Sequence, residues 1–255
     1  MISQKVHAYY FFGTCVRYIQ DAKEGVLLGG PAKVGGWYIR ANLEVFFKHL
    51  EEYGLVITIR ASHELREGYD ELSIKPPEHR LTAPEAARLS TSMTTLRHTL
   101  DAELEGLSAY IVTPKRLDSS KLLNEVAALL SPGVFEKLPS IAQYDLSEAG
   151  KCIAFERSTA GAFHILRATE AVLRVFYVAL VKRGRGSLMW GPILADLRRR
   201  RAGKAHGVLI ANLDNIRMSF RNPTQHPDAT YDTHEVQDLW ALCGDAISRM
   251  AKILK

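Results

Sequence analysis

Apolar residues recur at three- and four-residue steps through most of the chain, and the pattern is strongest in its last 110 or so positions. A long apolar pattern from Asp145 to Lys182 predicts either one helix or two helices with a kink near Ser158–Gly161. Further helices are expected at Trp190–Arg200, at Val208–Phe220 and from Thr233 to about Leu254. The C-terminal part is therefore predicted to be a bundle of four or five helices.

The sequence pattern of the N-terminal region also predicts mainly helices. A helix is expected at Tyr38–Tyr53, whereas Val6–Ile19 and Leu55–Ile59 fit either a helix or a strand. Two polar or extended stretches are candidate linkers, namely Gly68–Pro77 and Tyr110–Pro114.

The clearest helix start in the sequence is at Thr82. Pro84 occupies the first turn and Glu85 closes a capping box with Thr82. The apolar stripe that follows, from Leu89 to Leu107, needs a partner helix. That partner is either another helix of this chain or a second copy in a coiled-coil-like contact.

These patterns predict a mostly all-α protein with two parts. The boundary is expected near residue 140, which gives a mainly helical N-terminal region over residues 1–140 and a helical bundle over residues 141–255.

Composition narrows the class of protein. The formal net charge of +5 and the pI near 9.1 permit an anionic partner such as RNA without requiring one. Cys15, Cys152 and Cys243 show no paired spacing, which favours a reducing compartment over a disulfide framework or a zinc site. No apolar run has the length of a membrane span and no signal-peptide pattern is present, so a cytoplasmic address without membrane attachment is expected.

The stretch from Arg221 to His226 combines an arginine and a histidine around a helix-breaking Asn222-Pro223 pair. Proline disfavours the α region for the residue before it, so the preceding helix is predicted to stop near Arg221 or Asn222. Asp232 then caps the last helix, with Glu235 closing the capping box. Arg221 and His226 are thus predicted to lie at a corner between two helices.

Arg221, a polar Asn222 directly after it and four residues between Arg221 and His226 resemble the signature of the HEPN superfamily. The resemblance covers roughly residues 145–255. It implies an all-helical domain, and many members are metal-independent endoribonucleases that work as dimers, while others keep only the fold. The early helix of that family often carries an inward-facing acid, which corresponds here to Glu170.

The chemistry of RNA cleavage suits these residue types. Histidine titrates near neutrality and can move the proton of the 2′-hydroxyl or of the leaving 5′-oxygen. Arginine stays charged and matches two phosphate oxygens. Asn222 is expected to orient the phosphate or His226, and Glu170 to pair with Arg221 or, alternatively, only with Arg167 or Arg174 on its own helix. The motif contains one histidine, so the resemblance implies a two-fold homodimer whose composite site leaves a 2′,3′-cyclic phosphate.

A basic segment precedes the motif and is a candidate RNA-backbone contact. The alternative is a solvated helix end whose cations offset the helix dipole. The candidate RNA-binding residues are Arg198, Arg199, Arg200, Arg201 and Lys204.

Two functions from different classes remain open. The first is a metal-independent endoribonuclease without cofactor that acts as a toxin or phage-defence effector, with a cognate antitoxin or defence partner. The second is a catalytically inactive helical module for dimerisation or for binding RNA or a partner protein. A metal-dependent hydrolase is disfavoured because no His-Glu-x-x-His spacing is present.

Overall fold

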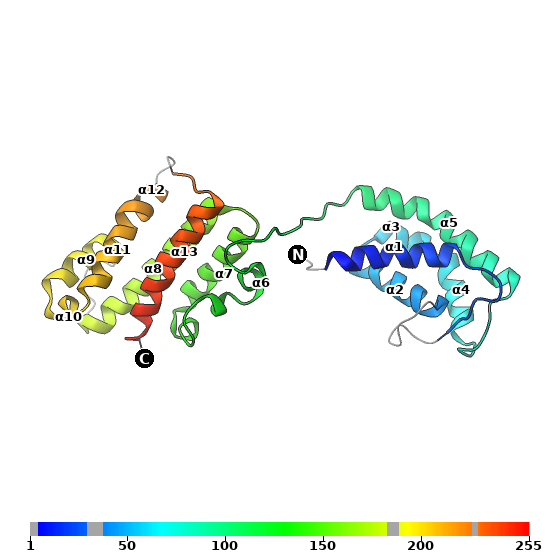
Figure 1. Ribbon diagram of the computed structural model, residues 1–255, viewed down its shortest axis with the longest axis horizontal. Coiled ribbons are helices and arrows are strands. Elements are labelled where there is room, and N and C mark those ends of the chain that lie inside the picture. Colours follow the sequence, from blue (N-terminus) through cyan, green and yellow to red (C-terminus); the bar gives the residue numbers. More distant parts are fainter. Residues whose placement is uncertain (1–4, 30–37, 183–188, 226–228, 255) are drawn as a thin grey trace. The chain divides into compact units, whose positions relative to one another are not determined.

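A computed structural model describes residues 5–29, 38–182, 189–225 and 229–254, and within these ranges the chain is all-α (Figure 1). Apart from an isolated antiparallel bridge between Leu27 and Arg80, these ranges contain no β-structure. None of the helices found there combines the length and the apolar character needed to cross a lipid bilayer. The chain divides into two compact units, unit 1 over Met1–Tyr110 and unit 2 over Ile111–Lys255.

Unit 1 packs helices around a core of its own. The two stretches that fitted either a helix or a strand are both helical. The first buries Phe12, Cys15, Val16 and Ile19 at helical spacing, whereas the second buries Thr58 and leaves Val56 and Ile57 exposed. The helices are α1 (Val6–Gln20), α2 (Ile39–Glu52), α3 (Val56–Ala61), α4 (His63–Ser73) and α5 (Ala83–Glu105). The predicted linker at Gly68–Pro77 is wrong in its first half, since α4 continues to Ser73 and buries Gly68 and Leu72.

Helix α5 begins as its sequence predicts. The capping box is formed, and the backbone N–H of Thr82 donates to the Glu85 carboxylate over 2.8 Å. The apolar stripe of α5 is buried against α1, α3 and α4 of the same unit. Leu89, Met93 and Leu100 are at most 3% exposed, so these positions have their partner helices within the chain.

Unit 2 is the predicted bundle (Figure 1). Its helices of ten or more residues are α7 (Ser140–Ala154), α8 (Ser158–Val181), α9 (Trp190–Arg199), α11 (Gly207–Ile216) and α13 (Thr233–Ala251). Helix α8 is central, because it contacts α7, α9 and α13. Shorter elements complete the unit, namely α6 (Ser119–Asn124), η2 (Val126–Leu129), η3 (Phe135–Lys137), α10 (Arg201–Lys204), the π-helical turn η4 (Arg217–Arg221) and α12 (Asn222–Thr224).

Residues 111–140 belong to unit 2, although the sequence pattern assigned them to the N-terminal region. Leu122 and Val126 are buried in the same core as α7 and α8. A Cβ at Gly150 of α7 would lie 2.3 Å from the carbonyl oxygen of Leu122, so glycine is what lets α6 approach α7 this closely. The contact crosses residue 140, and the division between the units therefore falls earlier in the chain, at Tyr110.

The long apolar segment of unit 2 is two helices. Helix α7 ends at Ala154 and α8 begins at Ser158, with Glu156 between them in the left-handed region at φ 59°. The break therefore precedes the predicted kink. Gly161 serves close packing, because a Cβ there would lie 3.3 Å from side-chain atoms of Ile153 on α7 and Val236 on α13.

The cysteines are free, and two of them behave as buried apolar residues. Burial raises the pKa of Cys15 to about 11 and that of Cys243 to about 12. These two thiols therefore stay protonated near neutral pH.

Candidate functional site

Arg221 lies in a helix that does not stop where the sequence predicts. The helical path of α11 continues through η4 and α12 to Thr224, past Pro223. The backbone N–H of Asn222 donates to the carbonyl oxygen of Arg217, five residues earlier, so the turn before the proline is widened by one residue. The predicted stop near Arg221 or Asn222 is wrong because this wider turn carries the chain through the proline.

Side-chain hydroxyls hold the end of this helix. The Thr224 hydroxyl donates to the carbonyl oxygen of Phe220 over 2.6 Å and lies 2.7 Å from the Tyr231 hydroxyl. Tyr231 also stacks on the Phe220 ring and donates to the same carbonyl. His226 lies outside the described residues, but the chain on both sides of it is thus joined through Thr224 and Tyr231.

The start of α13 confirms its predicted cap. Asp232 accepts hydrogen bonds from the backbone N–H groups of His234 and Glu235, over 2.7 and 2.8 Å. The Glu235 carboxylate accepts in return from the N–H of Asp232. The pKa of Asp232 is lowered by these backbone hydrogen bonds, that from Glu235 first.

Arg221 forms an ion pair with Glu170 of α8. The Arg221 Nη2 lies 3.4 Å from Glu170 Oε2, and Arg174 Nη2 donates to Glu170 Oε1 over 2.7 Å. The Glu170 side chain is 15% exposed and that of Arg221 30%. Both pairings considered for Glu170, with Arg221 across helices and with Arg174 along α8, therefore occur together. The buried Nε of Arg221 has no hydrogen-bond partner within the described ranges.

Asn222 has a weak interaction only. Its side-chain amide lies 3.8 Å from the sulfur of Met218, one turn earlier, and sulfur is a poor acceptor. In the part of the chain that the structure describes, no other side chain bonds to the Asn222 amide.

A second charged cluster lies nearer the start of α8, and the sequence pattern did not predict it. The buried carboxylate of Asp145 on α7 accepts from His164 Nδ1 over 2.9 Å and from Arg167 Nε over 3.1 Å. His164 is half-buried, and its bond to Asp145 makes it a satisfied residue at the edge of the core. The sequence signal was an acid among apolar positions of α7, facing a histidine and an arginine one turn apart on α8.

The two clusters meet at a cavity of about 400 Å³, the α7–α8 cavity. Charged and apolar side chains line it together. The lining residues are Pro139, Ile141, Asp145, Arg167, Glu170, Ala171, Arg174 and Val175. Helix α8 thus presents Arg167, Glu170 and Arg174 along one stripe. Arg221 contacts this stripe from η4.

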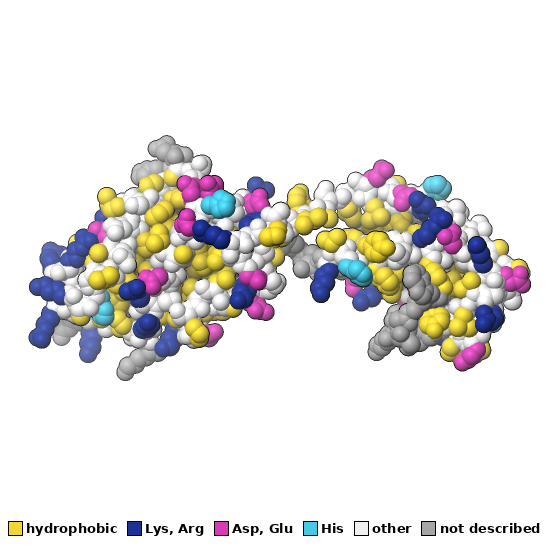
Figure 2. Space-filling view, in the orientation of Figure 1, with side chains coloured by type: hydrophobic (Ala, Val, Ile, Leu, Met, Phe, Trp, Pro, Cys, Tyr) yellow, Lys and Arg dark blue, Asp and Glu magenta, His cyan; other side chains and the backbone are white. Residues whose placement is uncertain are grey.

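The basic segment forms the end of α9 and the whole of α10 (Figure 2). Arg198 pairs with Asp214 of α11, and Arg200 with Asp196. Hydrogen bonds from these arginines lower the pKa of Asp214 and of Asp196. Two of the five candidate RNA-binding cations are therefore partly neutralised within the bundle.

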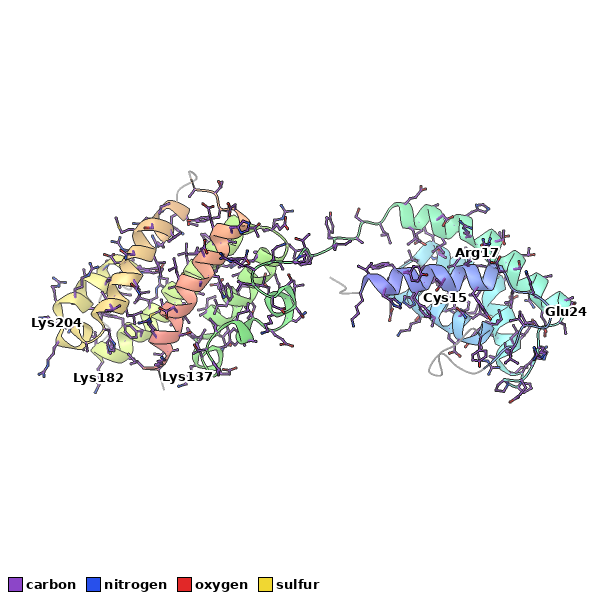
Figure 3. All side chains as sticks on the ribbon, viewed as in Figure 1. Cys15, Arg17, Glu24, Lys137, Lys182 and Lys204 are labelled. Carbon is purple, nitrogen blue, oxygen red and sulfur yellow. The ribbon has the colours of Figure 1, made fainter. Side chains whose placement is uncertain are left out.

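The remaining cations of this segment are open to solvent. Arg199 is 78% exposed, at 3.9 Å from Asp196, and Arg201 and Lys204 are exposed without an ion pair in the described ranges. Lys204 projects outward from the same end of unit 2 as Lys182 (Figure 3). The segment and Arg221 lie at opposite ends of α11 and η4, about 20 Å apart at 1.5 Å per residue.

Comparisons with known proteins find no matching family model, no matching curated protein and no matching solved structure. Among the residues that the structure describes, no group of three or more His, Cys, Asp or Glu side chains could hold a metal ion.

Proposed function

We propose that unit 2 is a metal-independent endoribonuclease of HEPN type, in which Arg221 binds the scissile phosphate and His226 transfers protons. The observation that supports this most is the arrangement of Arg221. Its guanidinium is oriented by Glu170, its Nε has no hydrogen-bond partner among the described residues, and it stands five residues before the histidine of the motif. π-helical turns are frequent at functional sites, which agrees with the place of Arg221 in η4.

The proposed reaction is an in-line attack. The 2′-hydroxyl oxygen forms a bond to the phosphorus while the bond to the 5′-oxygen breaks, which yields a 2′,3′-cyclic phosphate and a 5′-hydroxyl end. A base removes the 2′-proton and an acid protonates the leaving oxygen. Arg221 stabilises the charge that builds on the phosphoryl oxygens. A two-fold dimer with facing motifs supplies the second histidine, so that one imidazole acts as base and the other as acid.

A second function is supported by a specific observation. The ion pair between Arg221 and Glu170 ties η4 to α8 within one chain, and such a pair stabilises a helical bundle without any catalysis. In that case the unit is an inactive HEPN-like module that dimerises or binds RNA or a partner protein.

Substitution at the motif separates the two functions. Purified protein in EDTA is expected to cleave single-stranded RNA, and His226→Ala is expected to lower the rate about 100-fold or more, as for loss of a general acid or base. Arg221→Lys keeps the charge but loses the two-pronged phosphate contact, so it is expected to lower the rate as well. The products are identified by mass spectrometry of the 3′ ends.

His98→Ala is the matched control, because His98 is exposed on α5 of unit 1. It should cleave like the unchanged protein, and all variants should melt at the same temperature. If cleavage requires dimers, the specific activity should fall on dilution. An unchanged protein that leaves RNA intact, or a His226→Ala variant that cleaves it normally, would reject the nuclease in favour of the inactive module.

A further inference from the structure

We propose that the α7–α8 cavity binds one unpaired nucleotide, with its phosphate on Arg167 and Arg174 and its base against the apolar wall. The identification of this nucleotide as a neighbour of the cleaved bond rests on the proposed function. The binding itself follows from the arrangement of charge, shape and apolar surface in unit 2.

The two arginines are oriented in advance. Arg167 donates its Nε–H to the buried Asp145, and its terminal nitrogens have no acceptor within the described ranges. Arg174 uses Nη2 on Glu170 and keeps its other donors. Their side chains are 45% and 48% exposed, so an incoming phosphate reaches them. Guanidinium groups fixed in this way lose less conformational entropy when they bind a phosphate.

The carboxylates beside them do not repel an anion as free acids would. Asp145 is bonded to His164 and Arg167, and Glu170 to Arg174 and Arg221. The lining itself has two arginines and two carboxylates, and Arg221, which pairs with Glu170, adds a third cation beside it. An anion that enters the cavity therefore meets arginine donors together with carboxylates that are already hydrogen-bonded.

The remaining wall is apolar and suits a flat ring. Pro139 and Ile141 come from the start of α7, and Ala171 and Val175 from α8. Ile141 is 47% and Val175 40% exposed, so both offer apolar surface to a ligand. A volume of about 400 Å³ lies within the range of small-ligand sites. Proteins commonly stack unpaired RNA bases on arginine planes, and flipped bases also pack between apolar side chains.

Glu170 connects this cavity with Arg221. It lines the cavity and also pairs with the Arg221 guanidinium. A nucleotide in the cavity would consequently place its flanking phosphodiester beside Arg221. Inorganic phosphate would use the arginines but leave the apolar wall empty, so a whole nucleotide fits the cavity better.

Isothermal titration calorimetry of the full chain tests the inference with three probes, namely adenosine 3′-monophosphate, adenosine and inorganic phosphate. The nucleotide is expected to bind at least about tenfold more tightly than either part, because each part lacks one set of contacts. Arg174→Gln should weaken nucleotide binding about tenfold, as loss of a charged hydrogen bond predicts. Ala171→Leu, which fills the cavity without changing charge, should weaken it comparably.

Arg249→Gln is the matched control, because Arg249 also pairs with an acid four residues away on an exposed helix face. It should bind the nucleotide normally. Equal binding of inorganic phosphate and nucleotide, no measurable binding, or normal binding by both cavity variants would overturn the inference. A protein that binds the nucleotide as expected but leaves RNA intact would keep the cavity and reject the nuclease.

Discussion

At the scale of single residues, Asp145 is the side chain of unit 2 that most needs hydrogen-bond partners. Its carboxylate is fully buried, and burying a charge is costly unless it is paired and hydrogen-bonded. His164 and Arg167 supply that pairing from the neighbouring helix. Both donors are partly exposed, whereas the Asp145 side chain is 1% exposed, so the two hydrogen bonds take the place of water for this acid.

We therefore expect Asp145→Ala to lower the free energy of unfolding by about 2–4 kcal/mol, since it removes a fully buried acceptor of two side-chain hydrogen bonds. Asp245→Ala is the control, because Asp245 also pairs with an arginine but is 51% exposed, and it should cost less than about 1 kcal/mol. Trp190 and Trp240 are buried in unit 2 and report its unfolding by fluorescence in urea. Equal losses for the two variants would contradict this ranking.

Single residues also show what the sequence can predict about the site. The pairing of Glu170 with Arg174 was predictable, because it joins positions four apart on one helix. Its pairing with Arg221 could be named only with the help of a family resemblance. The contact of Asp145 with Arg167 was not predictable, because it depends on how α7 and α8 pack, which local spacing does not encode.

At the scale of elements, helix starts were predictable and one helix end was not. The capping boxes at Thr82 and Asp232 depend on residues within one turn, so the sequence contains the whole signal. The stop expected before Pro223 depended on a local steric rule. The helix continues past that point because of a widened turn and because the hydroxyls of Thr224 and Tyr231 hold its end. Tyr231 is distant enough in sequence that no local rule includes it.

The start of α5 also predicts a pH dependence. Burial raises the pKa of Glu85, but hydrogen bonds from Lys75, the Thr82 backbone and His79 outweigh it and lower that pKa from 4.5 to about 2. Because the folded-state pKa is the lower one, this carboxylate stabilises the fold fully above about pH 4.5 and loses that effect as the pH falls towards about 2.

Glu85→Gln should therefore lower the free energy of unfolding by up to about 3 kcal/mol at pH 7. The difference from the unchanged protein should shrink steadily between pH 4.5 and pH 2. Urea unfolding at a series of pH values, followed by circular dichroism, measures it. A deficit that stays constant down to pH 2 would show that the charge of Glu85 contributes nothing.

At the scale of the whole molecule, two separate cores define two units. The all-α class was predictable because apolar spacing repeats in almost every segment. The boundary expected near residue 140 was not, since residues 111–140 belong to unit 2 and share the core of α7. The actual connection, around Tyr110, coincides with the candidate linker Tyr110–Pro114, which runs without helix between α5 and α6.

Limited proteolysis should locate that connection. Tyr110 is 85% exposed and Ile111 74%, and both lie in extended backbone between α5 and α6. Low concentrations of chymotrypsin are expected to cut first after Tyr110 and to leave two fragments that resist further digestion, as shown by mass spectrometry. First cuts near residue 140 would instead support the boundary that the apolar pattern predicted.

The widened turn at Arg217–Arg221 contains one surplus residue relative to a regular α-helix. Each residue of a regular α-helix adds about 100° of rotation, so a turn that takes in one residue more, at a smaller rotation per residue, keeps the helix beyond it in phase with α11. The same five residues in a regular α-helical turn would rotate the Arg221 side chain by roughly 100° away from Glu170. The direction of the Arg221 guanidinium therefore depends on the wider turn as well as on the residue types of the motif.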